Sequence, residues 1–258
     1  MLEFLTASQV ESSRPCLSRK RPHQANMDLR VSVAKAAKYA TAESGDTLEM
    51  IERPGGGLSF VLVDGQRSGR SAKNISNLVA RKAISLLAEG VRDGAAARAA
   101  SDYLFAQRSG QVVATLNILS VDLASRSVVV TRNNPDPVYL IQQGQIAVID
   151  QPSLSIGTRR NVRPVIDEIP LEAGLVLLAF TDGLTHAGER KGTPLAIRDA
   201  LTKLIGGALP VDRWADELLR WAVDLDEGRP GDDISVLVLT VQPGTGDEVR
   251  QLWVRMPL

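Results

Sequence analysis

The sequence predicts an α+β fold in which mainly antiparallel sheets carry helices on their outer faces. Three observations predict this fold. Most apolar runs are short, alternate with polar residues and follow one another through turns, as in hairpin-linked strands. Four longer stretches show the helical period and occur as two pairs. The chain has 258 residues, 44% of them apolar and 23% charged, which is typical of a globular protein with a sizeable core.

The first half of the chain predicts a hairpin followed by two helices. In order, the elements are a strand at the start of residues 29–39, strands over 47–53 and 58–64, and helices over 71–90 and 93–108. The turn between the two hairpin strands is Pro-Gly-Gly-Gly, which is slightly longer than a two-residue loop. Ile75, Val79 and Leu86 belong to an apolar stripe at helical spacing, which ends at Gly90. The second helix is expected to open with Asp93 in its cap.

The second half predicts a run of strands, two helices and a final buried strand. The elements are strands over 112–122 and 127–133, two strands around a glycine turn in 137–150, strands over 162–171 and 175–182, helices over 197–205 and 211–225, and strands over 232–242 and 248–256. The chain shows no internal repeat and no interior linker. Residues 28–258 are therefore predicted to form a single domain.

Residues 1–27 differ from the rest and are predicted to be a flexible basic tail. Four basic side chains stand against two acidic ones there, so the tail carries +2 and the neutral total leaves −2 for residues 28–258. Met27 directly precedes the first predicted strand, which leaves open whether it is the natural start. No apolar run approaches the ~20 residues of a membrane span. Zero net charge argues against a nucleic-acid binder.

The rare residues restrict the chemistry. Cys16 is the one cysteine, which excludes an internal disulfide and favours a reducing, cytoplasmic location. From residue 28 onward there is no cysteine, and His186 is the one histidine. That domain therefore cannot use a thiolate nucleophile or a structural zinc site built from several Cys or His ligands. What remains is carboxylate chemistry, alone or with hard metal ions that prefer oxygen ligands.

Aspartates stand where apolar strands are predicted to end or begin. They are Asp46, Asp64, Asp182, Asp232 and Asp233. One such residue means little, because Asp-Gly turns are common at strand ends. If the strands are neighbours, however, their ends gather carboxylates at one sheet edge, where like charges need a cation. With no thiolate or histidine cluster nearby, the expected cation is Mg²⁺ or Mn²⁺, and two such ions could activate water for attack on phosphorus.

These residues lie in segments that resemble the PPM-type metal-dependent protein serine/threonine phosphatases, especially the SpoIIE-like bacterial branch. The matching segments are SGD (44–46), VDGQRSGRSA (63–72), ATLNILSVD (114–122), NNPDPVYLI (133–141), LAFTDGLTHAG (178–188) and GDDISVLVL (231–239). The resemblance covers almost all of 28–242. It implies a four-layer α-β-β-α sandwich of two mainly antiparallel sheets flanked by helices. It also implies that the helix from about Ser71 is a regulatory element.

The resemblance assigns a role to each aspartate. The implied catalytic residues are Asp64, Asp182 and Asp232. Asp64 would bridge two Mn²⁺ or Mg²⁺ ions, with the Gly65 carbonyl on the second ion and Asp182 and Asp232 on the first. Asp233 would either be a supporting ligand or hold other ligands in place without touching the metal, and Asp46 would hold water on the metal. The nucleophile would be a metal-activated water, so no phosphoenzyme is expected.

Two departures from the family pattern bear on the site. Eukaryotic-type members carry a glutamate where this chain has Gly45, which implies a weaker second metal site. Their phosphate-clamping arginine has no match in this sequence, and Arg67, Arg70 and Lys73 are candidates to contact a substrate phosphate. On a helix, such residues more commonly form a solvated face. His186 is a candidate general acid for the leaving seryl oxygen, against the alternative of an exposed loop histidine.

Three functions follow from these observations. The first is a phosphatase acting on phosphoserine or phosphothreonine of a bacterial signalling protein, such as a STAS-type anti-sigma antagonist. The second is a catalytically weak regulator that keeps the fold and acts by binding a partner. The third is a metal-dependent hydrolase of small phosphate esters. The sequence leaves the oligomeric state and the activating signal open.

Overall fold

The computed structural model describes residues 27–244, 246 and 249–255, so the predicted tail lies outside the described residues except for Met27. The strands are β1 (Met27–Ala36), β2 (Thr47–Glu52), β3 (Gly57–Gly65), β4 (Ala114–Asp122), β5 (Ser127–Asn133), β6 (Val138–Gln142), β7 (Gln145–Ile149), β8 (Val165–Pro170), β9 (Val176–Phe180) and β10 (Ile234–Pro243). The helices are α1 (Gly69–Ala88), α2 (Asp93–Arg108), α3 (Gly183–His186), α4 (Ile197–Gly206) and α5 (Trp214–Leu225), with 3-10 turns at Glu189–Lys191 and Val211–Arg213.

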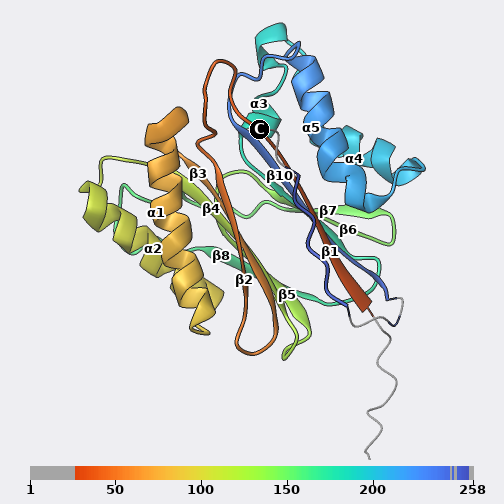
Figure 1. Cartoon of the computed structure of the whole chain (residues 1–258), viewed down its shortest axis with the longest axis horizontal. Helices are drawn as coiled ribbons and strands as arrows, with labels where there is room; N and C mark the ends of the chain where they lie inside the picture. Colours follow the sequence, from red (N-terminus) through yellow and green to blue (C-terminus); the bar gives the residue numbers. More distant parts are fainter. Residues whose placement is uncertain (1–26, 245, 247–248, 256–258) are drawn as a thin grey trace, which may run out of the picture.

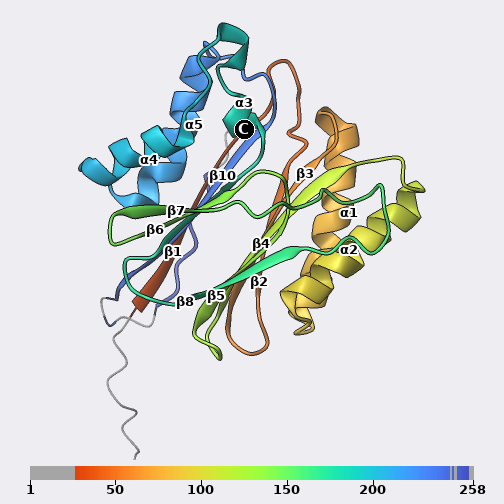
Figure 2. The same ribbon diagram turned by 180° about the vertical axis from the view of Figure 1, so that it is seen from behind.

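The strands form two five-stranded sheets in which every neighbouring pair is antiparallel. The first sheet has the order β2-β3-β4-β5-β8, and the second has the order β1-β10-β9-β6-β7. Figure 1 shows α1 and α2 on one side of the strands and α4 and α5 on the other, and Figure 2 shows the same arrangement from behind. The predicted four-layer α-β-β-α sandwich is confirmed.

The strands of the first sheet are apolar on both faces because each face is covered. Phe60 on β3 lies in the cluster between the two sheets, together with Leu177 and Leu237 of the second sheet. The next residue, Val61, points to the opposite face and packs with α1 and α2, for example with Val79. Successive strand residues alternate between faces, so a strand buried on both sides reads as a continuous apolar run.

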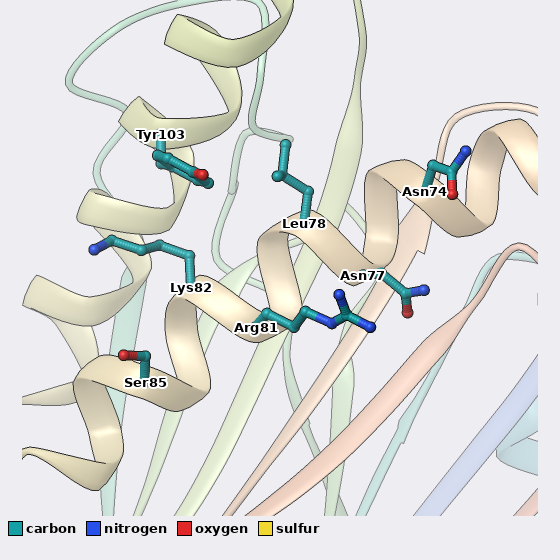
Figure 3. A pocket seen from close by; sticks show the side chains of 7 residues that line it. All are labelled: Asn74, Asn77, Leu78, Arg81, Lys82, Ser85 and Tyr103. Atoms are coloured by element: carbon teal, nitrogen blue, oxygen red, sulfur yellow. The ribbon is translucent and has the colours of Figure 1, made fainter.

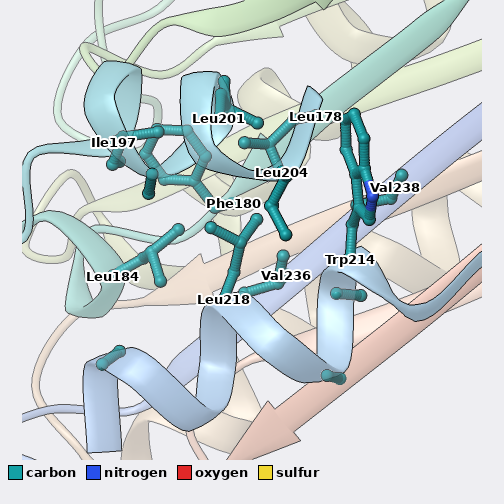
Figure 4. Packing of buried hydrophobic residues seen from close by; sticks show 14 of the residues in the cluster. Leu178, Phe180, Leu184, Ile197, Leu201, Leu204, Trp214, Leu218, Val236 and Val238 are labelled. Atoms are coloured by element: carbon teal, nitrogen blue, oxygen red, sulfur yellow. The ribbon is translucent and has the colours of Figure 1, made fainter. Parts of the chain in front are cut away.

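The outer face of the second sheet is covered by α4 and α5. Figure 4 shows Leu201 of α4 and Trp214 and Leu218 of α5 packed against Phe180 and Val236 of the central strands. Phe180, Leu201, Leu218 and Val236 are fully buried. Burying such a side chain contributes about 1.5–3 kcal/mol to folding, so this cluster holds the central strands β9 and β10 in place.

Most predicted elements are found within a few residues of their expected bounds, but two expectations are wrong. Residues 249–255, the described part of the strand predicted over 248–256, form neither strand nor helix. That run contains alternating apolar residues, yet it is not a strand, and Trp253 is 89% exposed. The cap of α2 is Arg92 rather than Asp93, whose buried carboxylate pairs with Arg53 at 2.9 Å. A buried carboxylate without a counter-charge is costly, so the Asp93 side chain pairs with Arg53 instead of capping the helix.

Two further findings concern the helices. The short helix α3, which follows Asp182 directly, was not predicted, because four residues are too few to show a helical period. Within the described residues, no helix combines the length and apolar character needed to cross a bilayer.

Candidate metal centre

The antiparallel topology brings the aspartate-bearing strand ends to one edge. β9 pairs with β10 through Phe180 and Val236, so the residues after β9 and those before β10 lie side by side. β1 pairs with β10 through Ala36 and Ile234, which brings the end of β1 to the same place. Asp182 follows β9, and Asp232 precedes β10. The predicted gathering of carboxylates at one edge is therefore a direct consequence of strand order.

Asp46 joins the two sheets at this edge. It directly precedes β2 of the first sheet and is fully buried. Its Oδ2 accepts hydrogen bonds from Thr181 Oγ1 at 2.8 Å and Ser235 Oγ at 2.6 Å, both from the second sheet. Its Oδ1 is buried without a hydrogen-bond partner. A buried acceptor without a donor is costly, so this oxygen suits a cation or a proton.

Asp64 stands near the end of β3 and is the most perturbed group at this edge. Burial, followed by the nearby charges of Asp46, Asp182 and Asp232 in that order, raises the pKa of the Asp64 carboxyl to about 9. Burial also raises the pKa of Asp46, although the hydrogen bonds from Ser235 and Thr181 oppose the rise. Carboxylates that resist ionisation because they are buried and lie close to one another are matched to a positive charge placed among them.

Asp182 and Asp232 form the more exposed half of the site. Burial, followed by the charge of Asp232, raises the pKa of Asp182 to about 6, while nearby His186 lowers it. The Asp182 side chain is 38% exposed, and its Oδ2 lies 3.9 Å from His186 Nδ1. Asp232 Oδ1 accepts a hydrogen bond from the Asp233 N–H at 2.9 Å. Both carboxylates therefore stand where water and a substrate can reach them.

Asp233 is occupied by the protein itself. Its Oδ1 accepts from the Lys38 N–H at 3.0 Å, and its Oδ2 accepts from the Gly45 N–H at 2.9 Å. These bonds hold the segment between β1 and β2 and thereby fix the position of Asp46. Both oxygens of Asp233 thus accept hydrogen bonds from backbone amides, and whether Asp233 also binds a metal stays a prediction.

Two glycines let the backbone approach closely at the site. A Cβ on Gly65 would lie 2.2 Å from the Ala72 carbonyl oxygen of α1, and one on Gly183 would lie 2.1 Å from the Asp233 carbonyl oxygen. Neither distance is possible for a real side chain, so both positions require glycine. The packing of Gly183 brings the TDG and GDD segments into backbone contact. Gly65 lies directly under the first turn of α1.

Gly45 also has no room for a side chain. A Cβ there would lie 2.6 Å from the Ala72 Cβ of α1 and 3.1 Å from Asp233 Oδ2. The glutamate of eukaryotic-type members would therefore displace α1 or the Asp233 carboxylate. Because residue 45 is glycine and not glutamate, α1 can pack closely on the segment that carries Asp46.

α1 contacts the Asp46 segment through polar side chains. Lys73 Nζ donates to the Asp46 carbonyl oxygen at 2.6 Å and to Thr47 Oγ1 at 3.1 Å, and Lys35 Nζ of β1 donates to the same carbonyl at 3.0 Å. Ser76 Oγ donates to the Gly45 carbonyl at 2.5 Å. Lys73 thus holds the backbone beside Asp46, while Arg67 and Arg70 are exposed. Whether either arginine contacts a substrate phosphate stays a prediction.

The donor set fits a hard divalent cation, although its carboxylates do not yet surround one position for an ion. It consists of carboxylate oxygens, the ligands that Mg²⁺ and Mn²⁺ prefer, and it includes the unpartnered Asp46 Oδ1. In the described part of the chain, no group of three or more His, Cys, Asp or Glu side chains is already arranged to hold a metal ion. The carboxylates are neighbours that would have to draw together around an ion.

A groove of about 550 Å³ lies away from this edge, on the outer surface of α1 and α2. Figure 3 shows Arg81 and Lys82 of α1 and Tyr103 of α2 along it. Lys82 Nζ lies 5.8 Å from the centre of the Tyr103 ring. None of the aspartates of the metal edge lines this groove.

The sequence did not reveal the hydroxyl groups that hold Asp46. Thr181 directly precedes Asp182 and Ser235 stands two positions after Asp233, but Thr and Ser are common in strands and carry no distinctive signal. Asp136 was also missed. Burial raises the pKa of Asp136, His186 lowers it, and its charge contributes to the raised pKa of Asp182. It followed two asparagines in a segment expected to be a loop.

Comparison with known proteins agrees with this geometry. The family model for stage II sporulation protein E (SpoIIE) matches residues 54–242. The stage II sporulation protein E of Priestia megaterium is 22% identical over 152 residues, which cover 59% of this chain and 26% of that protein. The chain thus spans about a quarter of the length of this curated relative.

Solved structures share the fold. The PP2C phosphatase domain of Bacillus subtilis SpoIIE, solved with a fragment of its regulatory domain, has a TM-score of 0.72 at 20% identity over 85% of this chain and 64% of that one. The RsbU and RsbW domains of a Mycobacterium tuberculosis protein have a TM-score of 0.71 at 19% identity, covering 84% and 61%. The catalytic domain of the phosphatase PstP, in complex with two manganese ions, has a TM-score of 0.64 at 20% identity, covering 84% and 100%. With a family model matched over most of its length and the fold of these phosphatase domains, the chain belongs to the SpoIIE family.

Proposed function

We propose that this chain is a metal-dependent protein phosphatase that hydrolyses phosphoserine or phosphothreonine on a bacterial signalling protein in the cytoplasm. The observation that carries the proposal is the convergence of Asp46, Asp64, Asp182 and Asp232 at one edge, with a pKa of about 9 for Asp64 and about 6 for Asp182. Groups with perturbed pKa values cluster at functional sites. Family membership and fold support the same reaction.

Asp64, Asp182 and Asp232 would hold Mn²⁺ or Mg²⁺, with Asp46, the Gly65 carbonyl and Asp233 as the further predicted ligands or supports. Two such ions would supply an activated water for in-line attack and neutralise the charge of the phosphate. The chain itself fixes the Asp46 carboxylate through Thr181 and Ser235 and leaves one oxygen free to accept a proton or a cation. The second ion would be held less tightly, because Gly45 replaces a glutamate.

His186 is the proposed donor of a proton to the leaving seryl oxygen. His186 is the last residue of α3, four residues after Asp182. Its side chain is 52% exposed, so it stands at the exposed side of the site. His186 lies near enough to Asp136 to lower the pKa of that carboxyl. Leaving-group protonation by a positioned side chain typically contributes about 10²–10⁴-fold to a rate.

A phosphorylated STAS-type protein is the proposed substrate. This proposal is supported by the likeness to a structure that contains RsbU and RsbW domains and to the SpoIIE phosphatase domain. The exposed position of Asp182 and His186 suits a phosphorylated side chain presented on the surface of another protein.

The experiment is an assay of phosphate release from a phosphorylated STAS protein and from a generic phosphate ester, with and without Mn²⁺. We expect Mn²⁺-stimulated hydrolysis that is lost in EDTA and in Asp64→Ala and Asp182→Ala. The control is Asp199→Asn, on the exposed face of α4. Wild-type rates in either alanine variant, or in excess EDTA, would contradict the proposal. A faster reaction on a free nucleotide than on the phosphoprotein would favour the small-ester hydrolase instead.

The alternative is a catalytically weak regulator that acts by binding a partner. Two observations favour it: the carboxylates of the described residues are not already arranged around a metal position, and α1 packs directly on Gly45. Calorimetric titration with Mn²⁺ separates the two functions. A site tighter than about millimolar is expected of the phosphatase, and weaker binding together with no turnover would favour the regulator.

A further inference from the structure

Asp226 is a buried carboxylate that the proposed chemistry does not use. It directly follows α5, and its side chain is 4% exposed. A carboxylate taken out of water needs hydrogen bonds or a counter-charge. The partners of this one therefore show what it does in the fold.

Asp226 accepts hydrogen bonds from two backbone amides in different loops. Its Oδ1 accepts from the Gly188 N–H at 3.2 Å, and its Oδ2 accepts from the Gly231 N–H at 2.9 Å. Gly188 ends the segment that runs from Asp182 through α3, and Gly231 directly precedes Asp232. One side chain thus connects the two loops that carry Asp182 and Asp232.

The surroundings of Asp226 restrict both loops further. Gly188 has a φ of +81°, and a Cβ there would lie 2.2 Å from the Thr193 carbonyl oxygen, so its backbone is confined. Arg190 Nη2 lies 3.7 Å from Asp226 Oδ2 and donates to the Arg229 carbonyl oxygen at 2.7 Å. The same guanidinium lies close to Gly231, where an added Cβ would come within 3.0 Å of Arg190 Nη2.

We propose that Asp226 is a positioning residue that sets the separation of Asp182 and Asp232 for metal binding. This inference rests on the proposed function, because it takes Asp182 and Asp232 as ligands. The negative charges of Asp182 and Asp232 repel each other, and both residues stand outside the strands, after β9 and before β10. A carboxylate that binds an amide of each loop opposes that repulsion.

The arrangement requires a carboxylate rather than a polar residue of the same size. Each oxygen of an aspartate accepts one amide, and hydrogen bonds to a charged acceptor are stronger than those to a neutral one. An asparagine offers one acceptor oxygen, and its NH₂ group would face the second amide, so one loop would be released. Supporting residues of this kind typically change metal affinity by about 10–100-fold when substituted.

Asp93 provides a matched control elsewhere in the fold. It is also buried, at 6% exposure, and also accepts hydrogen bonds, from Arg53 and Ser120. These contacts tie α2 to the outer face of the first sheet, away from Asp182 and Asp232. Asp93→Asn therefore disturbs a buried carboxylate of similar burial without touching the loops of the metal edge.

The test measures Mn²⁺ affinity by calorimetry on the full chain, together with thermal unfolding of the metal-free protein, for wild type, Asp226→Asn and Asp93→Asn. We expect Asp226→Asn to weaken Mn²⁺ binding about 10–100-fold, and Asp93→Asn to keep the wild-type affinity even if both lower Tm equally. The Mn²⁺ concentration for half-maximal activity should rise by the same factor in Asp226→Asn, with activity recovering at saturating Mn²⁺. Asp226→Ser, whose hydroxyl can satisfy only one amide, is the second variant if Asp226→Asn does not unfold cooperatively.

Unchanged Mn²⁺ affinity in the folded Asp226 variant would overturn the inference and leave the proposed function intact. An equal weakening in Asp93→Asn would also overturn it, because the effect would then come from general destabilisation. If the wild-type chain itself binds no Mn²⁺, the proposed function fails, and the inference fails with it. The wild-type titration therefore distinguishes the two failures.

Discussion

The Asp46 carboxylate accepts a hydrogen bond from the Thr181 hydroxyl at 2.8 Å, across a sequence separation of 135 residues. Asp46 precedes the edge strand of the first sheet, and Thr181 follows β9 in the second, so this bond connects the two sheets at the metal edge. Thr181 Oγ1 also accepts from the Ser235 N–H at 2.9 Å. One hydroxyl therefore orients a predicted metal-site carboxylate and the start of β10 together.

Thr181→Val should destabilise the metal-free protein by about 1–3 kcal/mol, because the buried Ser235 N–H loses its side-chain acceptor and Asp46 Oδ2 loses one of its two donors. Urea unfolding measures this change. The control is Thr202→Val on α4, whose hydroxyl donates to the Arg198 carbonyl on an exposed face. We expect little effect from the control. Equal stabilities of the two variants would show that the hydroxyl of Thr181 has no such role.

The stability of the metal-free protein should fall as pH rises between about 4 and 9. The pKa of Asp64 is about 9 in the folded chain against an ordinary value of 3.8, so in this window the folded state keeps a proton that the unfolded chain has lost. Stability falls with pH wherever the folded state binds more protons. Asp64→Asn should reduce this slope and be more stable than wild type at pH 8.

This pH dependence is measured by urea unfolding in EDTA across the window, with Asp199→Asn as the control on the exposed face of α4. The control should follow the wild-type slope. The difference in unfolding free energy between wild type and Asp64→Asn should change between pH 5 and pH 8. If it is the same at both pH values, the proton on Asp64 is not the cause of the pH dependence.

Gly45→Glu should destabilise the chain by about 1–3 kcal/mol rather than strengthen a second metal site, because the new Cβ would lie 2.6 Å from the Ala72 Cβ. Ala72→Gly in the same chain should recover part of this loss. A double-mutant cycle on unfolding free energies measures the coupling between Gly45→Glu and Ala72→Gly. It separates this coupling from the cost of placing glycine in a helix. Additive effects would mean that a side chain introduced at Gly45 does not clash with Ala72.

Lys73→Met should weaken Mn²⁺ binding and lower the unfolding free energy by about 1–3 kcal/mol, because the Asp46 carbonyl and Thr47 lose a charged donor. The matched control is Lys82→Met on the same helix, whose ammonium lies over the Tyr103 ring away from the site. Calorimetry and urea unfolding give the two quantities. A larger loss of Mn²⁺ affinity in Lys82→Met would argue against this role of Lys73.

The positions of the site aspartates could be predicted because their signal is local. An aspartate directly after or before a fully apolar run, as at Asp64 or Asp182, marks a strand end that cannot be buried without a partner. The helices could be predicted for the same reason, since their apolar stripes are read along the chain. The strand expected over 248–256 shows the limit of this reading, because alternation does not supply a neighbouring strand.

The partners of the buried polar groups could not be predicted. Asp93 looked like a helix cap, but its carboxylate pairs with Arg53 from the preceding hairpin. Lys73 looked like part of a solvated face, but its ammonium holds the Asp46 carbonyl. In each case the local pattern allowed two outcomes, and the packing of a distant segment selected one.

The sequence by itself determined the kinds of element, their order and the carboxylate chemistry, because periodicity and residue type act over a few neighbouring positions. The tertiary structure decided which groups face one another: Thr181 and Ser235 on Asp46, Lys38 and Gly45 on Asp233, and Gly188 and Gly231 on Asp226. The physical reason is that a buried carboxylate takes whichever donors the packed sheets and helices bring within about 3 Å. Most of those donors come from segments far away in the sequence.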